Sequence, residues 1–90
     1  MMEILKSASV GTLESSDAYI EIEPCAHGIK IDIESIVEKQ FGEQIRTTVL
    51  EVLSELGVEN AELRIKDRGA LACVLRARVE TAVGRGKEAN

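Results

Sequence analysis

Apolar and polar residues alternate in three short segments of the chain, 17–23, 29–34 and 58–66. Alternation puts successive side chains on opposite faces, which is typical of β-strands with one buried face. The positions expected to face the core are Ala18, Ile20, Ile22, Ile29, Ile31, Ile33, Ala61, Leu63 and Ile65. Residues 24–28, Pro-Cys-Ala-His-Gly, form a turn-like link between the first two segments. We therefore expect these two strands to pair as an antiparallel hairpin.

Two longer segments, 35–56 and 70–83, repeat apolar residues every three or four positions, which predicts amphipathic helices. The residues expected to face the core are Val37, Phe41, Ile45, Val49, Val52, Leu53 and Leu56 in the first helix, and Leu71, Val74, Leu75, Val79 and Ala82 in the second. Ser35 and Glu38 have the spacing of a capping box at the start of the first helix. Gly57 is expected to end that helix, and residues 84–86, Gly-Arg-Gly, the second.

The expected order of elements is therefore β-β-α-β-α. The economical arrangement is an α+β two-layer sandwich, with a three-stranded sheet and two helices on one face. The connection through the first helix favours a parallel, right-handed arrangement of the second and third strands. We expect one domain, residues 1–90. Within it, residues 1–16 form an irregular arm, residues 17–84 the α+β core and residues 85–90 a frayed tail.

The composition narrows the choice of partners. Hydrophobic residues make up 44% of the 90 positions, with one Phe, one Tyr and no Trp, so the core is expected to be aliphatic. A net charge of -5 argues against nucleic acid and against an anionic membrane surface, since both select clustered Lys and Arg. No apolar run has the length of a signal peptide or a membrane span. We expect a cytoplasmic protein that binds neither nucleic acid nor membrane.

Cysteine and histidine give no metal or catalytic site. Cys25 and Cys73 are far apart, and His27 is the only histidine, so neither a zinc site nor a disulfide framework is expected. Cys73 falls in the second helix and is expected to be a small buried residue. Cys25 and His27 lie two positions apart in a turn. A Cys/His dyad there would lack a third, orienting group, so ordinary turn residues are the favoured interpretation.

The segment 10–17, Val-Gly-Thr-Leu-Glu-Ser-Ser-Asp, places two hydroxyls between two carboxylates just before the first strand. It holds no histidine, no Gly-x-Ser-x-Gly elbow and no Ser-x-x-Lys, so nothing in it activates Ser15 or Ser16 as a nucleophile. An exposed loop serine on a small rigid domain suits a covalent attachment point, because its hydroxyl must enter another enzyme's active site. The alternative is that both serines are turn or cap residues. Glu14 and Asp17 either keep the loop away from the domain or simply add solubility.

Three blocks resemble the acyl carrier proteins of citrate lyase, the gamma subunits of that complex. Residues 11–17 are similar to the attachment loop of that family, residues 37–42 (Val-Glu-Lys-Gln-Phe-Gly) to the start of its long helix, and residues 69–71 and 73–80 to its final helix. The blocks have the family's order and spacing and cover nearly the whole chain. The resemblance implies one acyl carrier domain with Ser15, directly after the glutamate, as its attachment site. The residues alone leave Ser16 as an alternative.

The resemblance further implies a prosthetic group, 2′-(5″-triphosphoribosyl)-3′-dephosphocoenzyme A, joined to Ser15 through a phosphodiester. Its thiol would carry acetyl and citryl thioesters while citrate is cleaved to acetate and oxaloacetate, as in citrate fermentation. The implied partners are an alpha subunit (acyl transferase) and a beta subunit (citryl lyase). A prosthetic-group transferase and an acetylating ligase would act transiently. The carrier itself would be non-catalytic.

Some residues depart from the family or have more than one interpretation. Ala72 stands where the family often has an acid, Ile36 where serine is common, and Val10 where alanine is common, which weakens any transfer of subunit contacts.

Five arginines are candidates for a basic patch facing phosphates or a partner: Arg64, Arg68, Arg76, Arg78 and Arg85. Positions 76 and 78 point to different sides of a helix. A structural role is favoured for Arg78, either snorkelling along the apolar stripe or pairing with an acid, and Arg76 stays open.

Other classes of function explain less of the chain. A noncovalent α+β interaction or regulatory module is the main alternative, and it would never carry an added mass. A phosphopantetheine carrier would need a helical bundle with Asp-Ser-Leu at a helix start. A small RNA-binding domain would need a basic Gly-x-x-Gly loop or exposed aromatic residues. An autonomous enzyme would need a converging acid, base, nucleophile or metal set.

Overall fold

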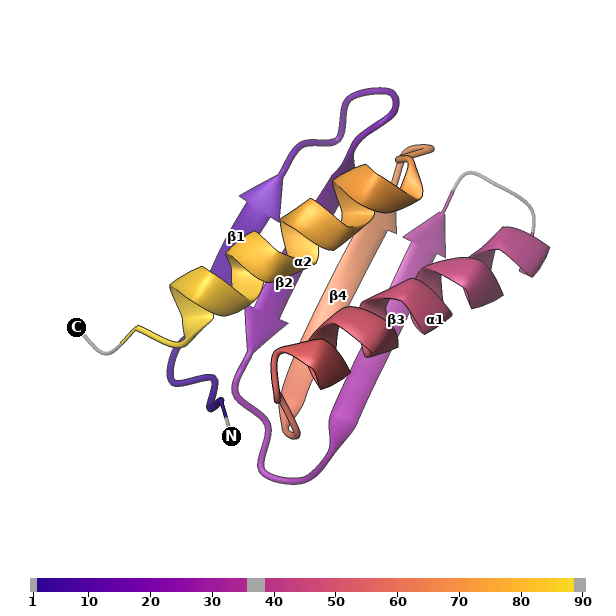
Figure 1. Ribbon diagram of the computed structural model, residues 1–90. Helices are drawn as coiled ribbons and strands as arrows, with labels where there is room; N and C mark the ends of the chain where they lie inside the picture. The colour runs from indigo at the N-terminus through magenta and orange to yellow at the C-terminus, as the bar shows by residue number, and fades with distance from the viewer. Residues whose placement is uncertain (1, 36–38, 89–90) are drawn as a thin grey trace.

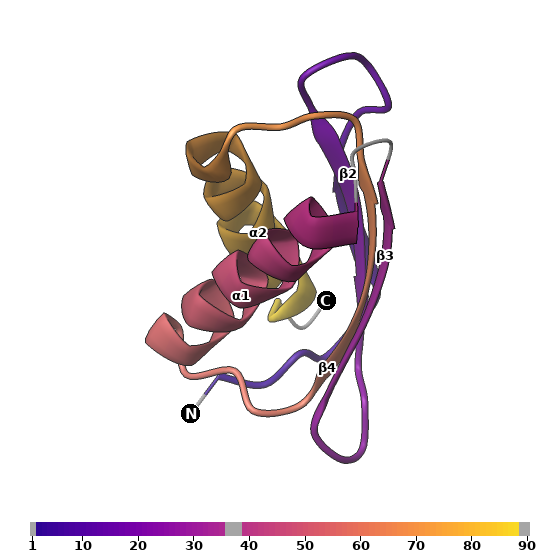
Figure 2. The ribbon, with the colours of Figure 1, turned by 90° about the vertical axis from the view of Figure 1, so that its right-hand side faces the viewer.

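The computed structural model describes residues 2–35 and 39–88, although the side chains of residues 39–41 are not described. A sheet forms one layer and two helices cover one of its faces (Figures 1 and 2). The elements in chain order are β1 (Ala8–Gly11), β2 (Ala18–Glu23), β3 (Ile29–Ser35), α1 (Lys39–Glu55), β4 (Ala61–Asp67) and α2 (Ala72–Gly86). Within the described residues, no helix is long and apolar enough to cross a membrane.

The expected three-stranded sheet is wrong, because the sheet has four strands in the order β1-β2-β4-β3. The additional strand, β1, lies inside the segment expected to be an irregular arm, and it pairs antiparallel with β2. β1 is only four residues long, with Ala8 and Val10 as its apolar positions. Two apolar residues are too few to show a period of two, so the local pattern does not predict this strand. Its pairing with β2 stabilises it instead.

The expected hairpin between β2 and β3 is also wrong. β4 lies between them, antiparallel to β2 and parallel to β3, so the parallel pairing of the second and third expected strands is confirmed. Charges on the outer face give a physical reason for this order. β4 places Arg64 between Glu21 of β2 and Asp32 of β3. Direct pairing of β2 with β3 would place acidic strands side by side, which is unfavourable.

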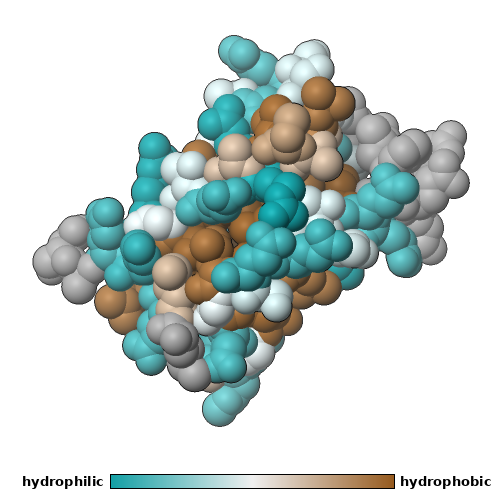
Figure 3. All heavy atoms as spheres, viewed as in Figure 1, coloured by the Kyte–Doolittle hydropathy of each residue, from teal (hydrophilic) through white to brown (hydrophobic). Residues whose placement is uncertain are grey.

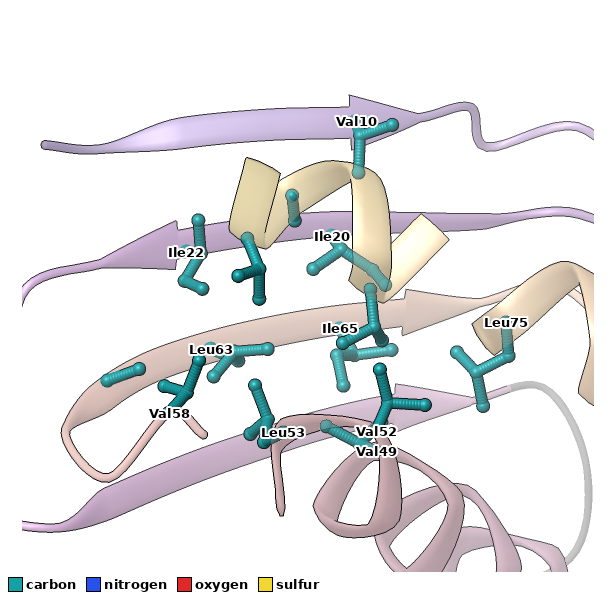
Figure 4. Close-up of a cluster of buried hydrophobic side chains, with 14 of the residues drawn as sticks. Val10, Ile20, Ile22, Val49, Val52, Leu53, Val58, Leu63, Ile65 and Leu75 are labelled. Carbon is teal, nitrogen blue, oxygen red and sulfur yellow. The ribbon is translucent and has the colours of Figure 1, made fainter. Parts of the chain in front are cut away.

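The core is aliphatic, as expected, and fills the space between the sheet and the helices (Figure 4). The inward residues of β2 and β4 are completely or almost completely buried: Ala18, Ile20, Ile22, Ala61, Leu63 and Ile65. Helix α1 contributes Ile45, Val49, Val52 and Leu53, and α2 contributes Leu75, Val79, Ala82 and Val83. The isoleucines of β3 are only half-buried, because β3 is an edge strand.

The helix ends differ in part from expectation. Helix α1 is followed by Gly57, whose φ of +74° is a conformation that glycine adopts freely. The expected capping box involves Glu38, and Val37 belongs to the same segment, so both predictions lie outside the described residues. The prediction that Leu71 faces the core is wrong, since its side chain is 69% exposed. Helix α2 ends within the expected residues 84–86, at Gly86, although it includes Gly84 and Arg85.

The last residue of α2 contacts the N-terminal segment of the chain. Gly86 packs so closely on the N-terminal segment that an added Cβ would lie 3.2 Å from Ile4 and 3.3 Å from Ile22. Its carbonyl accepts hydrogen bonds from the backbone N–H groups of Leu5 (2.8 Å) and Lys6 (3.1 Å). Glycine at the end of α2 therefore also allows close packing between the helix and a neighbouring segment.

Candidate functional site

Residues 12–17 connect β1 to β2 and are termed the serine loop. Gly11 leads into the loop with a φ of +94°, and a Cβ at this position would lie 1.9 Å from the carbonyl oxygen of Ala18. Both the backbone conformation and the close approach of the returning strand therefore require glycine. The loop lies at the same end of the molecule as the turn between β4 and α2 (Figure 1).

The two serines occupy the middle of a tight turn within this loop. The backbone N–H of Asp17 donates to the carbonyl oxygen of Glu14 at 3.2 Å, so Ser15 and Ser16 are the second and third residues of the turn. Ser16 has a φ of +67°, the positive value that type II turns require at this position. Such a conformation is costly for a residue other than glycine and persists where the surroundings hold it in place.

Asp17 fixes the end of the serine loop to α2. Arg78 of α2 donates from Nε to Oδ1 at 2.9 Å and from Nη2 to Oδ2 at 2.7 Å, a bidentate pair. The Thr12 hydroxyl donates to Oδ2 at 2.7 Å, and the backbone N–H of Ala18 donates to Oδ1 at 2.7 Å. Both ends of the loop therefore meet on one carboxylate. Asp17 holds the loop on the domain, which contradicts the suggestion that it keeps the loop away.

The electrostatics of Asp17 follow from these contacts. The hydrogen bonds from Arg78 are the main reason that the pKa of the Asp17 carboxyl lies far below its ordinary value. The Thr12 hydroxyl and the Ala18 backbone N–H also lower this pKa. Burial raises it, but by less than the hydrogen bonds from Arg78 lower it. The same pair raises the pKa of the Arg78 guanidinium. Asp17 is therefore a carboxylate at neutral pH, committed to Arg78, and cannot act as a general base for either serine.

A second connection ties the serine loop to the turn that follows β4. The backbone N–H of Ser16 donates to the carbonyl oxygen of Arg68 at 2.8 Å, and the N–H of Arg68 donates to the carbonyl of Asp17 at 2.9 Å. This turn is itself held by Asp67, which is 2% exposed. The Asp67 carboxylate accepts from the backbone N–H groups of Gly69 (3.1 Å) and Ala70 (3.0 Å), and from the Ser35 hydroxyl (3.0 Å).

Sequence reasoning missed this role of Asp67. The available signal was an aspartate followed by Arg-Gly directly after a strand, which is the pattern of a side chain that bonds the backbone of its own turn. The sequence alone gave no reason for the burial of this carboxylate, which also accepts a hydrogen bond from Ser35 at the end of β3, 32 residues away in sequence.

Both serines of the loop are exposed, as an attachment point requires. Neither hydroxyl has a hydrogen-bond partner among the residues that the structure describes. The backbone of Ser16 is bound to Arg68, whereas Ser15 makes no hydrogen bond in the described part of the chain. His27 lies in the loop between β2 and β3, which is at the opposite end of β2. Within the described residues no base is hydrogen-bonded to either hydroxyl, so the two serines suit the role of a substrate for another enzyme.

The arginines do not gather into one basic patch. Arg78 pairs with Asp17, Arg76 with Glu51 (3.6 Å) and Glu55 (2.6 Å), and Arg68 with Glu34 (3.8 Å). Arg64 lies on the outer face of the sheet against Glu21, Glu23 and Glu62, and Arg85 donates to the carbonyl oxygen of Ser9 at 2.9 Å. The expectation for Arg78 is confirmed, and the contact of Arg76 is now assigned.

The cysteines have different surroundings from those expected. Cys73 is exposed on α2, which contradicts its assignment as a small buried residue. Cys25 is partly exposed, and its thiol contacts the backbone carbonyl oxygen of His27 at 3.7 Å rather than the imidazole. This contact is that of a turn residue, not of a catalytic dyad.

Comparison with known proteins places this arrangement in a family. Residues 5–86 match the acyl carrier protein family model described as malonate decarboxylase delta subunit. The citrate lyase acyl carrier protein of Escherichia fergusonii is 53% identical over 88 residues, covering 97% of this chain and 91% of the relative. That of Fusobacterium nucleatum is 54% identical over 89 residues, covering 97% and 95%.

The fold has a counterpart among solved structures. A chain of a Pseudomonas malonate decarboxylase hetero-tetramer in complex with malonate superimposes with a TM-score of 0.73. The match covers 93% of this chain and 87% of the other, at 22% sequence identity, so it supports the fold alone. With a family model over most of its length and relatives at about half identity, the chain belongs to the family of citrate lyase acyl carrier proteins.

Proposed function

We propose that this protein is the acyl carrier subunit of a citrate lyase complex, and that Ser15 carries the prosthetic group. The complex cleaves citrate to acetate and oxaloacetate. The observation that carries the proposal is the geometry of the serine loop. The Ser15 hydroxyl is exposed and has no hydrogen-bond partner among the described residues, while Asp17 and Ser16 bind the turn to Arg78 and Arg68. The family relationship supplies the chemistry for which this geometry is suited.

The residues fit a phosphodiester-linked, coenzyme A-derived group. The proposed group is derived from 2′-(5″-triphosphoribosyl)-3′-dephosphocoenzyme A, and the Ser15 Oγ is the atom that forms the bond. When bound, the group supplies a terminal thiol that carries acetyl and citryl residues as thioesters. The hydroxyl suits this linkage because it is exposed and has no internal partner to give up. Ser16 is the weaker candidate, since its backbone is held by Arg68 and already has a positive φ.

The remaining residues of the chain position the anchor and leave the arm free. Arg78 holds the loop, while Arg64, Arg68 and Arg76 are engaged by carboxylates. Within the described residues no cluster of uncommitted guanidinium groups is left to bind the phosphates of the arm. The thiol can therefore move between active sites, and the tether raises its local concentration at each of them.

The proposal assigns the chemistry to partner subunits. An alpha subunit exchanges acetyl for citrate on the arm, and a beta subunit releases oxaloacetate. A prosthetic-group transferase and an acetylating ligase act on the carrier transiently. The carrier is non-catalytic in this scheme, and among the described residues no base is hydrogen-bonded to the hydroxyls of the serine loop. Cys25 and Cys73 are both free thiols, as is usual in the cytoplasm, where we place the complex.

The test is mass spectrometry on protein produced together with its modifying enzymes. We expect the added mass on the peptide that contains Ser15, its loss in Ser15→Ala, and its retention in Ser16→Ala, the matched control from the same turn. An unmodified peptide in a complex that cleaves citrate would contradict the proposal and favour a noncovalent α+β interaction module. Protein produced alone is expected to be unmodified.

A further inference from the structure

Two exposed leucines flank the proposed anchor. Among the described residues the large exposed hydrophobic side chains are Leu5 (51%), Leu13 (52%), Leu50 (42%) and Leu71 (69%). A single exposed leucine needs no explanation, because much of any protein surface is apolar. Leu13 and Leu71 differ from the other two in their place. Leu13 lies two residues before Ser15, and Leu71 precedes α2 at the same end of the molecule.

The segments that carry these leucines are fastened to one another. The N–H of Ser16 is bonded to the carbonyl of Arg68, three residues before Leu71. Asp17 is bonded to Arg78, two turns along the helix that Leu71 precedes. The loop that carries Leu13 and Ser15 is therefore fastened to the segment that leads to Leu71. Figure 3 shows hydrophobic residues gathered over the N-terminal part of α2, next to the serine loop.

Neither leucine is needed for the core. The fold leaves Leu71 more than two-thirds exposed although the helical pattern would place it inward, and Leu13 has half of its surface in water. Exposed apolar groups that gather at one place on a small protein are typical of an interaction site. The remaining question is which partner covers them.

We propose that Leu13, Leu71 and Glu14 form the docking surface for the transferase that loads the prosthetic group. This inference rests on the function proposed above. In the loading step, the Ser15 Oγ attacks the α-phosphorus of a coenzyme A-derived triphosphate. The Oγ–P bond forms, the bond from that phosphorus to pyrophosphate breaks, and pyrophosphate leaves. The serine proton passes to a base of the transferase or to water.

The geometry of the two stages selects this partner over the lyase subunits. Loading requires the Ser15 hydroxyl to reach bonding distance of phosphorus inside the transferase, so the residues around Ser15 must be within that interface. After loading, the reactive thiol is at the far end of the arm. Thioester chemistry at the alpha and beta subunits then does not require the surroundings of Ser15 to enter an active site.

Charge favours the same partner. A triphosphate donor is polyanionic, so the cleft that binds it must be lined by cations. Glu14 lies directly before Ser15, is exposed, and has no ion-pair partner among the described residues. Its free carboxylate complements a basic cleft entrance and would steer the carrier towards it.

The test measures the initial rate at which the purified transferase adds mass to each apo-carrier. The Leu13→Ala/Leu71→Ala double variant is expected to lower kcat/KM by about tenfold or more, mainly through KM, since each leucine loses its buried contact. Leu5→Ala and Leu50→Ala are matched controls with similar exposure elsewhere, and both are expected to load at the wild-type rate. Glu14→Gln is expected to raise KM at low salt and to have little effect at high salt.

The outcomes separate this inference from the proposed function. Unchanged loading of the double variant, with the same unfolding midpoint as wild type, would overturn the docking surface while Ser15 remained the anchor. An equal loss of citrate cleavage per loaded carrier would reassign the surface to the lyase subunits and also overturn it. Addition of the group to Ser15→Ala at the wild-type rate would instead remove the proposed anchor itself.

Discussion

The rigidity of the serine loop and the exposure of Ser15 come from different residues. Asp17 accepts hydrogen bonds from Arg78, Thr12 and Ala18, which fixes both ends of the loop against the domain. The turn between Glu14 and Asp17 then leaves Ser15 in solvent. An attachment point benefits from both properties, because a transferase must find the hydroxyl accessible and in a defined position.

Asp17→Asn is expected to reduce stability in a pH-dependent manner. The folded protein holds the pKa of Asp17 below its ordinary value of 3.8, so the stabilisation is complete above about pH 4 and is lost as the pH falls towards the folded pKa. The difference in free energy of unfolding between wild type and variant should therefore be largest near pH 7 and shrink below pH 4. Denaturant unfolding at pH 7, 5 and 3 measures it.

The control for this experiment is Glu14→Gln in the same loop. Its carboxylate has no ion-pair partner among the described residues, so the free energy of unfolding should change little at any of these pH values. A difference between wild type and Asp17→Asn that is the same at pH 7 and pH 3 would contradict the role assigned to the Asp17–Arg78 pair.

At the scale of elements, α2 connects the serine loop to the N-terminal segment. Arg78 near its middle holds Asp17, and Gly86 at its end packs against Ile4 and Ile22. The helix contains a second glycine, Gly84, around which an added Cβ would meet nothing within 4 Å. Two glycines near the end of one helix thus have different surroundings, one open and one closely packed.

Replacing these glycines by alanine should have opposite effects. Gly84→Ala is expected to stabilise the protein by about 0.5–1 kcal/mol, because alanine is the better helix former and has room. Gly86→Ala is expected to destabilise it by about 1–3 kcal/mol, because the methyl group would press on Ile4 and Ile22. Thermal and denaturant unfolding measure both. Equal stabilisation by the two substitutions would show that the contact at Gly86 is not restrictive.

At the scale of the whole molecule, the sheet order depends on pairing that a local pattern does not reveal. Alternation identified β2, β3 and β4 and their buried faces correctly, since burial of one face is a local property. It did not identify β1, and it did not show that β4 lies between β2 and β3. The acidic outer faces of β2 and β3 and the Arg64 and Lys66 of β4 were a usable signal for this order.

The candidate site was predictable to a similar degree. The serine pair and its exposure follow from a short local run, whereas the choice of that run as an attachment point depends on the family resemblance and stays a prediction. The contacts that hold it could not be inferred in the same way. Arg78 is 61 residues from Asp17 in sequence, and the Arg68 carbonyl reaches Ser16 only because β2 and β4 are neighbours. These contacts required the correct strand order first.

Arg64→Glu tests the electrostatic reason for that order. It would place a further acid among Glu21, Glu23 and Glu62, so the variant should be less stable than both wild type and the neutral control Arg64→Gln. The deficit relative to Arg64→Gln should decrease in 1 M salt, because the Debye length falls to about 3 Å. Equal stabilities of the two variants in urea unfolding at low salt would argue against charge as the cause.

The central claim is that the Ser15 hydroxyl carries the working arm of a citrate lyase, and the most direct test is the rate of citrate cleavage. The complex would be produced with its modifying enzymes and with wild-type, Ser15→Ala or Ser16→Ala carrier. The account predicts no cleavage above background with Ser15→Ala and substantial cleavage with Ser16→Ala. Cleavage at the wild-type rate by the Ser15→Ala complex would contradict it.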